Sequence, residues 1–326
     1  MNKKNITNRK VWFNGQIIPE KEANVSIYDS ALMFGDMVFE MTRSFNHNHF
    51  LLDKHIDRLL NSVKYVGIDI QYTKEEIIKF CEEITEINKE NIADEDEHRL
   101  MINISRGLLG IYENKVDAHS GVNLIISDFP LSWTVAGMGR LFDEGINAKV
   151  PNQRMTSPET IDPKIKSRSR LHYLMANKEV SEFKGENNWA LLLDTDGFIS
   201  EGTGSNFFII KNNKLISPEP RNMLRGISRD YVIELALDLN LEFVEKNIEI
   251  YDVMDADEAF FTATPFCMLP CVSINSYKIG TGTRGKVFDS LISKWSKKVD
   301  LDIETQIKMF NTKVMYDETT TTPYKF

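Results

Sequence analysis

The chain has few of the features that mark secreted, membrane-embedded or metal-binding proteins. Its three cysteines (Cys81, Cys267 and Cys271) cannot all pair with one another, and no second cysteine pair completes a zinc site beside Cys267 and Cys271. We therefore expect three reduced, buried thiols and no bound metal. The N-terminus lacks the apolar segment of a signal peptide, and no run reaches the ~20 apolar residues of a membrane span. These absences predict a cytoplasmic protein without a membrane segment.

Positive charge is also scarce. The formal net charge of -9 argues against a general nucleic-acid binder, which needs a basic surface to displace counterions. The negative net charge does not exclude a local basic pocket that binds an anionic ligand. Apolar residues make up 42% and charged residues 27%, as in an ordinary globular protein, and 326 residues suffice for two domains.

The residue patterns predict an α+β protein of two domains. In residues 1–130, Asn14-Gly15 predicts a tight hairpin, and apolar residues at a period near 3.6 predict helices from Asp53 and from Lys74. Residues 131–142 have no clear period and are interpreted as an interdomain linker. Residues 143–310 are rich in predicted strands and form a larger domain, and 311–326 form a tail.

Residue chemistry alone leaves the candidate site open. Ser228 follows Gly226 at the start of an amphipathic helix, where free N–H groups suit a phosphate, although a plain helix cap is the simpler explanation from residue chemistry alone. Glu201 stands beside a flexible turn, where most glutamates are solvated. Nothing in its own spacing distinguishes Lys166 from the other lysines.

The order of several motifs is more specific than any one of them. Together they resemble the class IV aminotransferases, which include branched-chain and D-amino-acid aminotransferases and aminodeoxychorismate lyase. The resemblance runs from Trp12 to about Trp295. The matching pieces are Trp12-Phe13-Asn14-Gly15, Phe34-Gly35-Asp36, Val38-Phe39-Glu40, His55-Ile56-Asp57-Arg58-Leu59, Ile165-Lys166-Ser167, Ser200-Glu201-Gly202-Thr203-Gly204-Ser205-Asn206, Leu224-Arg225-Gly226-Ile227-Ser228-Arg229-Asp230 and Thr262-Ala263-Thr264.

This resemblance implies pyridoxal 5'-phosphate (PLP) as cofactor and a fold with a smaller α/β sandwich-like N-terminal domain and a larger pseudo-barrel domain. Lys166 would carry the cofactor as a Schiff base and move the substrate proton, which requires a depressed pKa. Glu201 would pair with the pyridinium nitrogen and keep it protonated. Leu224 would pack on the ring. A homodimer is also implied.

The resemblance assigns the phosphate to one arginine and a set of smaller donors. Arg58 would grip it with a charge-assisted fork, although a solvated helix charge is the simpler explanation of this residue taken alone. The helpers would be the Ile227 and Ser228 N–H groups and the Thr264 hydroxyl. Arg170 falls near a position where branched-chain enzymes carry a tyrosine that bonds the phenolic oxygen, and where the lyases carry arginine.

Features near the expected substrate position disagree. Phe39 favours a branched-chain enzyme, whereas the D-amino-acid enzymes carry tyrosine there. Pro265 follows Thr264 and has no N–H to offer the substrate carboxylate, although branched-chain enzymes use such a group. The Tyr-x-Arg-Pro signature of those enzymes is absent. Arg43 and Arg106 are the candidates for holding the carboxylate, and Arg43 could equally be a surface residue.

The sequence therefore predicts a PLP-dependent aminotransferase that moves an amino group between a branched-chain-like amino acid and a 2-oxo acid. A PLP-dependent aminodeoxychorismate lyase and a D-amino-acid aminotransferase are the alternatives, and a non-catalytic PLP-binding relative is disfavoured by the intact Lys166 and Glu201.

Overall fold

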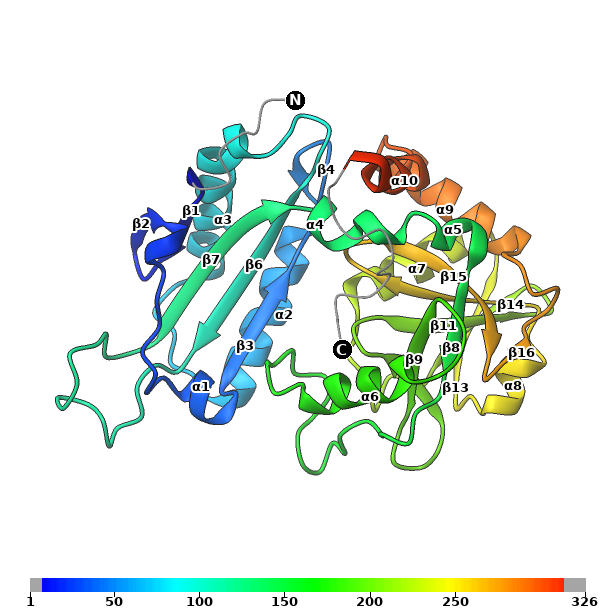
Figure 1. Cartoon of the computed structure of the whole chain (residues 1–326), viewed down its shortest axis with the longest axis horizontal. Helices are drawn as coiled ribbons and strands as arrows, with labels where there is room; N and C mark the ends of the chain where they lie inside the picture. Colours follow the sequence, from blue (N-terminus) through cyan, green and yellow to red (C-terminus); the bar gives the residue numbers. More distant parts are fainter. Residues whose placement is uncertain (1–7, 314–326) are drawn as a thin grey trace. The chain divides into compact units, whose positions relative to one another are not determined.

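The chain folds into two compact units in a computed structural model, which describes residues 8–313 (Figure 1). Unit 1 takes the described residues up to Trp133 together with Ile165–Arg170, and unit 2 takes Thr134–Lys164 and the described residues from Leu171. The segment interpreted as a linker is helical, and it buries Leu141 and Phe142 completely. Its helices are about one turn long, too short to show a period in sequence.

Unit 1 contains a five-stranded sheet in the order β2-β1-β7-β6-β3. Its hairpin turns at Asn14 and Gly15, both with positive φ, as the sequence predicts. The edge strand β3 ends at Met41, and a separate two-stranded ribbon of β4 and β5 follows it. The strands are β1 (Lys10–Phe13), β2 (Gln16–Pro19), β3 (Met37–Met41), β4 (Ser44–Phe45), β5 (Asn48–His49), β6 (His98–Ser105) and β7 (Asn123–Pro130).

Two amphipathic helices cover one face of this sheet, α2 (Leu52–Val66) and α3 (Lys74–Asn88) (Figure 1). Thr73 and Glu76 form a reciprocal capping box that fixes the start of α3. The apolar stripes of both helices pack on alternate residues of the strands, among them Ile56, Leu59, Ile77, Ile84, Leu100, Ile102 and Ile104. The short helix α1 (Ser30–Phe34) precedes β3.

The free edge of β3 is extended by residues distant in sequence. The N–H of Phe39 donates to the carbonyl of Lys166 at 2.9 Å, and the N–H of Arg168 donates to the carbonyl of Met37 at 2.8 Å. Val38 and Ser167 form the antiparallel bridge between these two bonds. The backbone around Lys166 therefore belongs to the sheet of unit 1.

Unit 2 is built on a nine-stranded mixed sheet. Eight strands follow the order β10-β9-β8-β15-β14-β11-β12-β13, and β16 pairs with β15. Stacked Phe208 and Phe260 rings lie in its core. The strands are β8 (Ile146–Lys149), β9 (Asn188–Leu193), β10 (Ile199–Gly202), β11 (Asn206–Lys211), β12 (Lys214–Pro218), β13 (Glu242–Lys246), β14 (Glu258–Ala263), β15 (Cys267–Ile274) and β16 (Tyr277–Lys278).

The helices of unit 2 are α4 (Ser132–Val135, at the boundary between the units), α5 (Leu141–Glu144), α6 (Leu171–Ser181), α7 (Ile227–Asp238), α8 (Ile250–Met254), α9 (Lys286–Lys298) and α10 (Ile303–Lys313). The first residues of the predicted tail belong to α10, and 314–326 lie outside the described residues. Within residues 8–313, no helix is long and apolar enough to cross a membrane. All three cysteines are free and buried, as predicted.

Candidate active site

In unit 1, Lys166 lies beside the aromatic ring predicted to face the substrate. Its Nζ is 5.0 Å from the centroid of the Phe39 ring. Its backbone N–H donates to the hydroxyl of Ser62 at 3.3 Å, and that hydroxyl in turn donates to the carbonyl of Arg58, one turn earlier on α2. Helix α2 therefore connects the lysine segment to the arginine predicted to bind phosphate.

Arg58 forms a bidentate ion pair with Glu40. Its Nε and Nη2 donate to the two carboxylate oxygens at 2.6 and 2.9 Å, and Nδ1 of His55 lies 2.8 Å from the same carboxylate. Burial alone would raise the pKa of Glu40, but Arg58 and His55 outweigh it and hold that pKa well below its usual range. Arg58 is therefore no solvated helix charge. Its role towards phosphate stays a prediction, and Glu40 fixes its orientation.

Two further arginines share the Phe39 ring with Lys166. The guanidinium carbon of Arg168 is 3.7 Å from the ring centroid, and that of Arg170 is 5.0 Å away. Arg168 also donates to the side-chain oxygen of Asn103 at 3.1 and 2.8 Å. Of these two arginines, only Arg170 is among the residues predicted from the sequence. The alternation of Lys166, Arg168 and Arg170 indicates an extended segment with its cations on one side, and could have identified Arg168.

The two arginines predicted to hold the substrate carboxylate lie in different surroundings. Arg43 is only 1% exposed, which excludes a surface position, and its guanidinium stacks on Phe45 at 3.9 Å. Arg106 is bound elsewhere: it pairs with Asp36 at 2.7 Å and donates to the Val66 and Gly67 carbonyls at the end of α2. This arrangement caps a helix, so a substrate carboxylate would compete with Asp36 for Arg106.

In unit 2, three donors hold the carboxylate of Glu201. The hydroxyl of Tyr173 and the N–H of Leu224 donate to its Oε1 at 2.7 and 3.3 Å, and the amide of Asn206 donates to Oε2 at 3.1 Å. Glu201 is 3% exposed, so the solvated glutamate expected from residue chemistry alone is wrong. Tyr173 was not identified from the sequence, because a tyrosine on an amphipathic helix is usually an ordinary core residue.

The start of α7 offers backbone donors. Gly226 is the N-cap residue, no side chain caps the first turn, and Ile227 and Ser228 are both buried. Ser228 is therefore not the helix cap that the simpler interpretation suggests. A Cβ on Gly226 would stand 2.0 Å from the side-chain oxygen of Asn206, so only glycine lets the helix begin this close to the partner of Glu201.

Thr264 and Pro265 lie in the turn that joins β14 to β15. The turn is closed by the Thr262 hydroxyl, which donates to the Cys267 carbonyl at 2.6 Å, and Cys267 has a φ of +62°. This is an uncommon conformation for a residue other than glycine and indicates a tightly defined turn. Thr264 directly follows the last residue of β14, Ala263.

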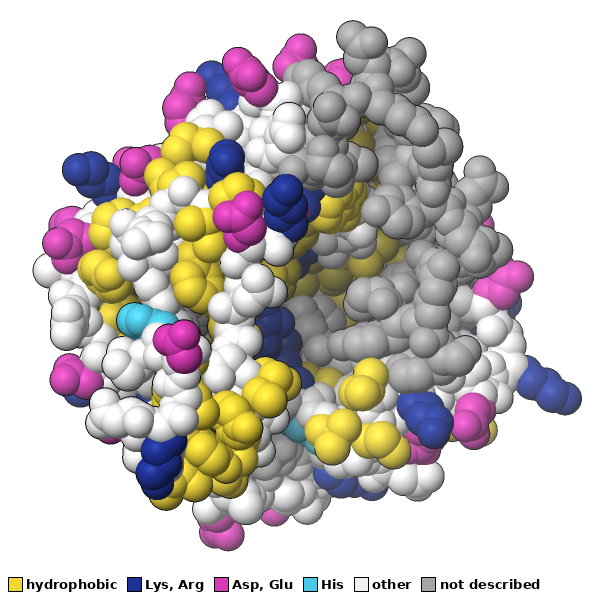
Figure 2. All heavy atoms as spheres, turned by 60° about the vertical axis from the view of Figure 1, so that its left-hand side comes forward, with side chains coloured by type: hydrophobic (Ala, Val, Ile, Leu, Met, Phe, Trp, Pro, Cys, Tyr) yellow, Lys and Arg dark blue, Asp and Glu magenta, His cyan; other side chains and the backbone are white. Residues whose placement is uncertain are grey.

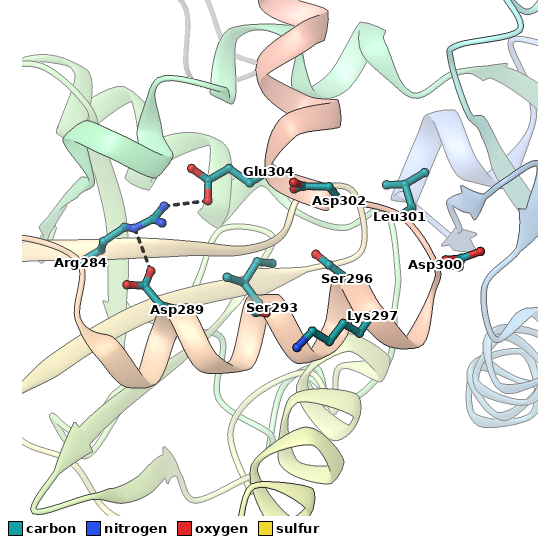
Figure 3. Close-up of a pocket in the computed structure, with 10 residues that line it drawn as sticks. Arg284, Asp289, Ser293, Ser296, Lys297, Asp300, Leu301, Asp302 and Glu304 are labelled. Atoms are coloured by element: carbon teal, nitrogen blue, oxygen red, sulfur yellow. Dashed lines mark hydrogen bonds and ion pairs between the residues drawn. The ribbon is translucent and has the colours of Figure 1, made fainter.

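A separate pocket in unit 2 lies between α9 and α10 and contains none of the predicted site residues (Figure 3). Arg284 pairs there with Asp289 at 2.9 Å and with Glu304 at 2.8 Å. Arg284 is thus held by two carboxylates of the fold, and we assign this pocket no role in the proposed chemistry.

Comparison with known proteins identifies the family. A sequence model of the class IV aminotransferases (Amino-transferase class IV) matches residues 37–274. The chain belongs to this family. It is 35% identical over 298 residues to a putative branched-chain-amino-acid aminotransferase of Methanocaldococcus jannaschii, covering 89% of this chain and 99% of that protein. It is also 28% identical to a D-alanine aminotransferase of Bacillus licheniformis, covering 85% and 92%.

A crystal structure of the Escherichia coli branched-chain amino acid aminotransferase matches this class IV aminotransferase with a TM-score of 0.78 and 27% identity, over 87% of this chain and 92% of that one. The fold expected from the motifs is confirmed by this match. The match also supports the assignment of this chain as a transaminase.

Proposed function

We propose that this class IV aminotransferase uses PLP to move an amino group between a branched-chain-like amino acid and a 2-oxo acid. The observation that best supports PLP as the cofactor is the buried Glu201 carboxylate, which Tyr173, Asn206 and the Leu224 N–H hold in one orientation. A carboxylate held in this way favours a cationic partner, such as the protonated nitrogen of a pyridine ring.

When bound, PLP would supply an electron-withdrawing ring that stabilises negative charge at the substrate carbon. The residues of this chain supply the rest. The Lys166 amine would hold the cofactor covalently and would carry the proton to and from the substrate carbon. Arg58, held by Glu40, and the N–H groups of Ile227 and Ser228 suit the phosphate.

Three smaller assignments complete the cofactor proposal. Thr264 would offer its hydroxyl to the phosphate, and Leu224 would pack against the ring. Arg170 would reach the phenolic oxygen. Its place beside the Phe39 ring that Lys166 also adjoins supports this role, because a cation near that oxygen stabilises its anionic form.

The branched-chain substrate is supported by the name of the Methanocaldococcus jannaschii relative and by the apolar ring of Phe39, which is 2% exposed beside the Lys166 amine. The Bacillus licheniformis relative supports a D-amino acid as the second candidate. Pro265 is a departure from the branched-chain pattern, because its missing N–H leaves the substrate carboxylate to another donor.

The first experiment is an absorption spectrum of the protein with PLP, followed by L-leucine, L-isoleucine, L-glutamate and D-alanine. We expect a visible band that a branched-chain amino acid converts to the pyridoxamine form. Lys166→Ala should abolish the band, whereas Lys164→Ala should keep it, because Lys164 pairs with Asp162 nearby. The proposal fails if the parent protein forms no band. Release of pyruvate from aminodeoxychorismate without an amino acceptor would indicate the lyase.

A second variant tests Glu201. Glu201→Gln keeps the size of the side chain and one acceptor oxygen, but it removes the charge and replaces the second acceptor oxygen by an NH2 donor. We expect turnover to fall by at least ~100-fold, about 2.7 kcal/mol in the activation barrier, while the melting temperature changes little. Equal turnover in the parent and the variant would contradict the role of Glu201.

We also propose a homodimer and a cytoplasmic location. Ile27, Leu32 and Phe34, at and before α1, are 73%, 63% and 69% exposed, and apolar exposure of this kind marks an interaction surface. Figure 2 shows hydrophobic side chains gathered toward the bottom of its view, at the level of α1 in Figure 1. The mass by light scattering should be twice that of the chain, and Phe34→Glu should lower it. The free cysteines agree with a reducing compartment.

A further inference from the structure

The segment around Lys166 adds positive charge to one face of the unit 1 sheet. Val38 and Ser167 form an antiparallel bridge, next to which Phe39 pairs with Lys166, and Val38 packs on the helices. Because side chains alternate along paired strands, Lys166, Arg168 and Phe39 lie on the face opposite the helices. The distances agree, since the Lys166 Nζ and the Arg168 guanidinium carbon are 5.0 and 3.7 Å from the centroid of the Phe39 ring.

The strands of this face offer no carboxylate to balance that charge. On β3, β6 and β7, all of which the structure describes, none of the residues that point away from the helices is aspartate or glutamate. Glu40 on β3 and Asp128 on β7 point to the helix side and are paired there. Asp29, from the segment before α1, reaches one end of the face, where Ser105 and Asn123 donate to its carboxylate.

The cations on this face repel one another. The guanidinium carbon of Arg170 is also 5.0 Å from the Phe39 centroid. Burial, followed by Arg170, lowers the pKa of Arg168 to about 10. Burial, followed by Arg43 and Arg168, lowers the pKa of Arg99 to about 9. The arginines still stay charged at neutral pH, so a lysine in the same field is the group that gives up its proton first.

The groups on the helix side do not reverse this field. The buried carboxylate of Glu40 is shared by Arg58 and His55, so a neighbouring cation opposes its charge. Burial is the main cause that lowers the pKa of His55, and the charges of Arg58 and Lys166 lower it further. A neutral His55 leaves Arg58 and Glu40 as a balanced pair behind the amine.

We propose that Arg168, supported by Arg170, keeps the Lys166 amine largely uncharged near neutral pH by electrostatic repulsion. The Phe39 ring attracts cations, but Arg168 takes the closest approach to it. The inference rests on the proposed function, in which the lone pair of the amine bonds to the cofactor and accepts the substrate proton. Arg168 acts through Lys166 and is therefore a positioning residue. Its two hydrogen bonds to Asn103, at 3.1 and 2.8 Å, fix the place of its charge.

The titration of the Lys166 amine is measured on the full chain freed of PLP. Trace acetylation with acetic anhydride across a range of pH, followed by peptide mass spectrometry, reports the neutral fraction of each lysine. Lys64, which is exposed on α2, is the internal reference. We expect the midpoint of Lys166 to lie below that of Lys64. Arg168→Met should raise it by about 1 pH unit, because the two charges lie at most about 9 Å apart in a medium of effective dielectric constant near 20.

Two further variants separate charge from packing. Arg168→Lys keeps the charge but loses the guanidinium fork, and its Lys166 midpoint should stay close to that of the parent. Arg9→Met removes another buried positive charge of unit 1, one that is already paired with Glu20, and should leave the midpoint unchanged. Equal midpoints in the parent and Arg168→Met overturn the proposal, as does an equal shift in Arg168→Met and Arg168→Lys.

The rate at which added PLP produces the visible band is a second readout. At pH 7 this rate should fall about 10-fold in Arg168→Met, and a rise of about one pH unit should restore it, because each unit changes the neutral fraction of the amine tenfold. A slower rate at every pH, with an unshifted Lys166 midpoint, would show that Arg168 only supports the fold. If the parent forms no band but the midpoint shifts as expected, the cofactor proposal fails and the inference about Arg168 stands.

Discussion

Replacing Glu40 by glutamine should destabilise unit 1 strongly. The carboxylate is fully buried and holds both Arg58, whose side chain is 14% exposed, and His55, which is 1% exposed. The variant leaves the guanidinium charge without its anion. Removing one partner of a buried ion pair costs about 3–5 kcal/mol, which lowers the melting temperature by roughly 2–4 °C for each kcal/mol.

The assay is urea unfolding of Glu40→Gln, Arg58→Met and the double variant, from which a coupling free energy is obtained. We expect the double variant to be more stable than the sum of the single losses, because no unpaired charge remains in it. The pH dependence has a defined sign. Because the folded pKa of Glu40 lies below its ordinary value of 4.5, the stabilisation is complete above pH 4.5 and disappears only in stronger acid. A loss under ~1 kcal/mol at pH 7 for Glu40→Gln would refute this reasoning.

Two further predictions follow from close contacts and burial. Gly226→Ala should lower the free energy of unfolding by about 1–3 kcal/mol and weaken PLP binding, because its Cβ would meet Asn206. The control Gly204→Ala, which has open space around it, should change neither quantity. Thermal melting and PLP titration measure the two effects. Burial, and to a lesser degree the neighbouring His98, lowers the pKa of His49 to about 3. The contribution of His49 to the free energy of unfolding is therefore complete above pH 6.5 and falls as the pH drops towards 3. In acid-unfolding curves, His49→Gln should reduce the slope of the free energy of unfolding against pH by up to about 1.4 kcal/mol per pH unit.

Elements with strong local signals could be predicted from the sequence. Asn14-Gly15 marked the hairpin, and the apolar periods marked α2 and α3 close to their observed bounds. The strand β8 and the helices α8 and α10 were missed. The first two span only four or five residues, and α10 has a polar sequence whose few apolar residues give a weak period.

The candidate site was only partly predictable. The motif order identified Lys166, Glu201 and Arg58, but it gave no information on what holds each of them. Tyr173 and Glu40 act through contacts 28 and 18 residues away in sequence, which no local pattern reveals. For Arg106, the sequence identified the kind of partner but not the partner itself. Its guanidinium suits a carboxylate, and in the fold that carboxylate is the side chain of Asp36.

Because residues around Lys166 pair with the edge of β3, no single break in the chain divides it into the two units. The chain leaves unit 1 after Trp133, returns for Ile165–Arg170 and leaves again. A fragment ending at Trp133 would lack both the amine and the hydrogen-bond partners of Met37 and Phe39. Its exposed strand edge would invite aggregation. During synthesis, β3 must wait for more than a hundred residues before its edge is covered, so a chaperone that shields residues 37–41 would aid folding most at that stage.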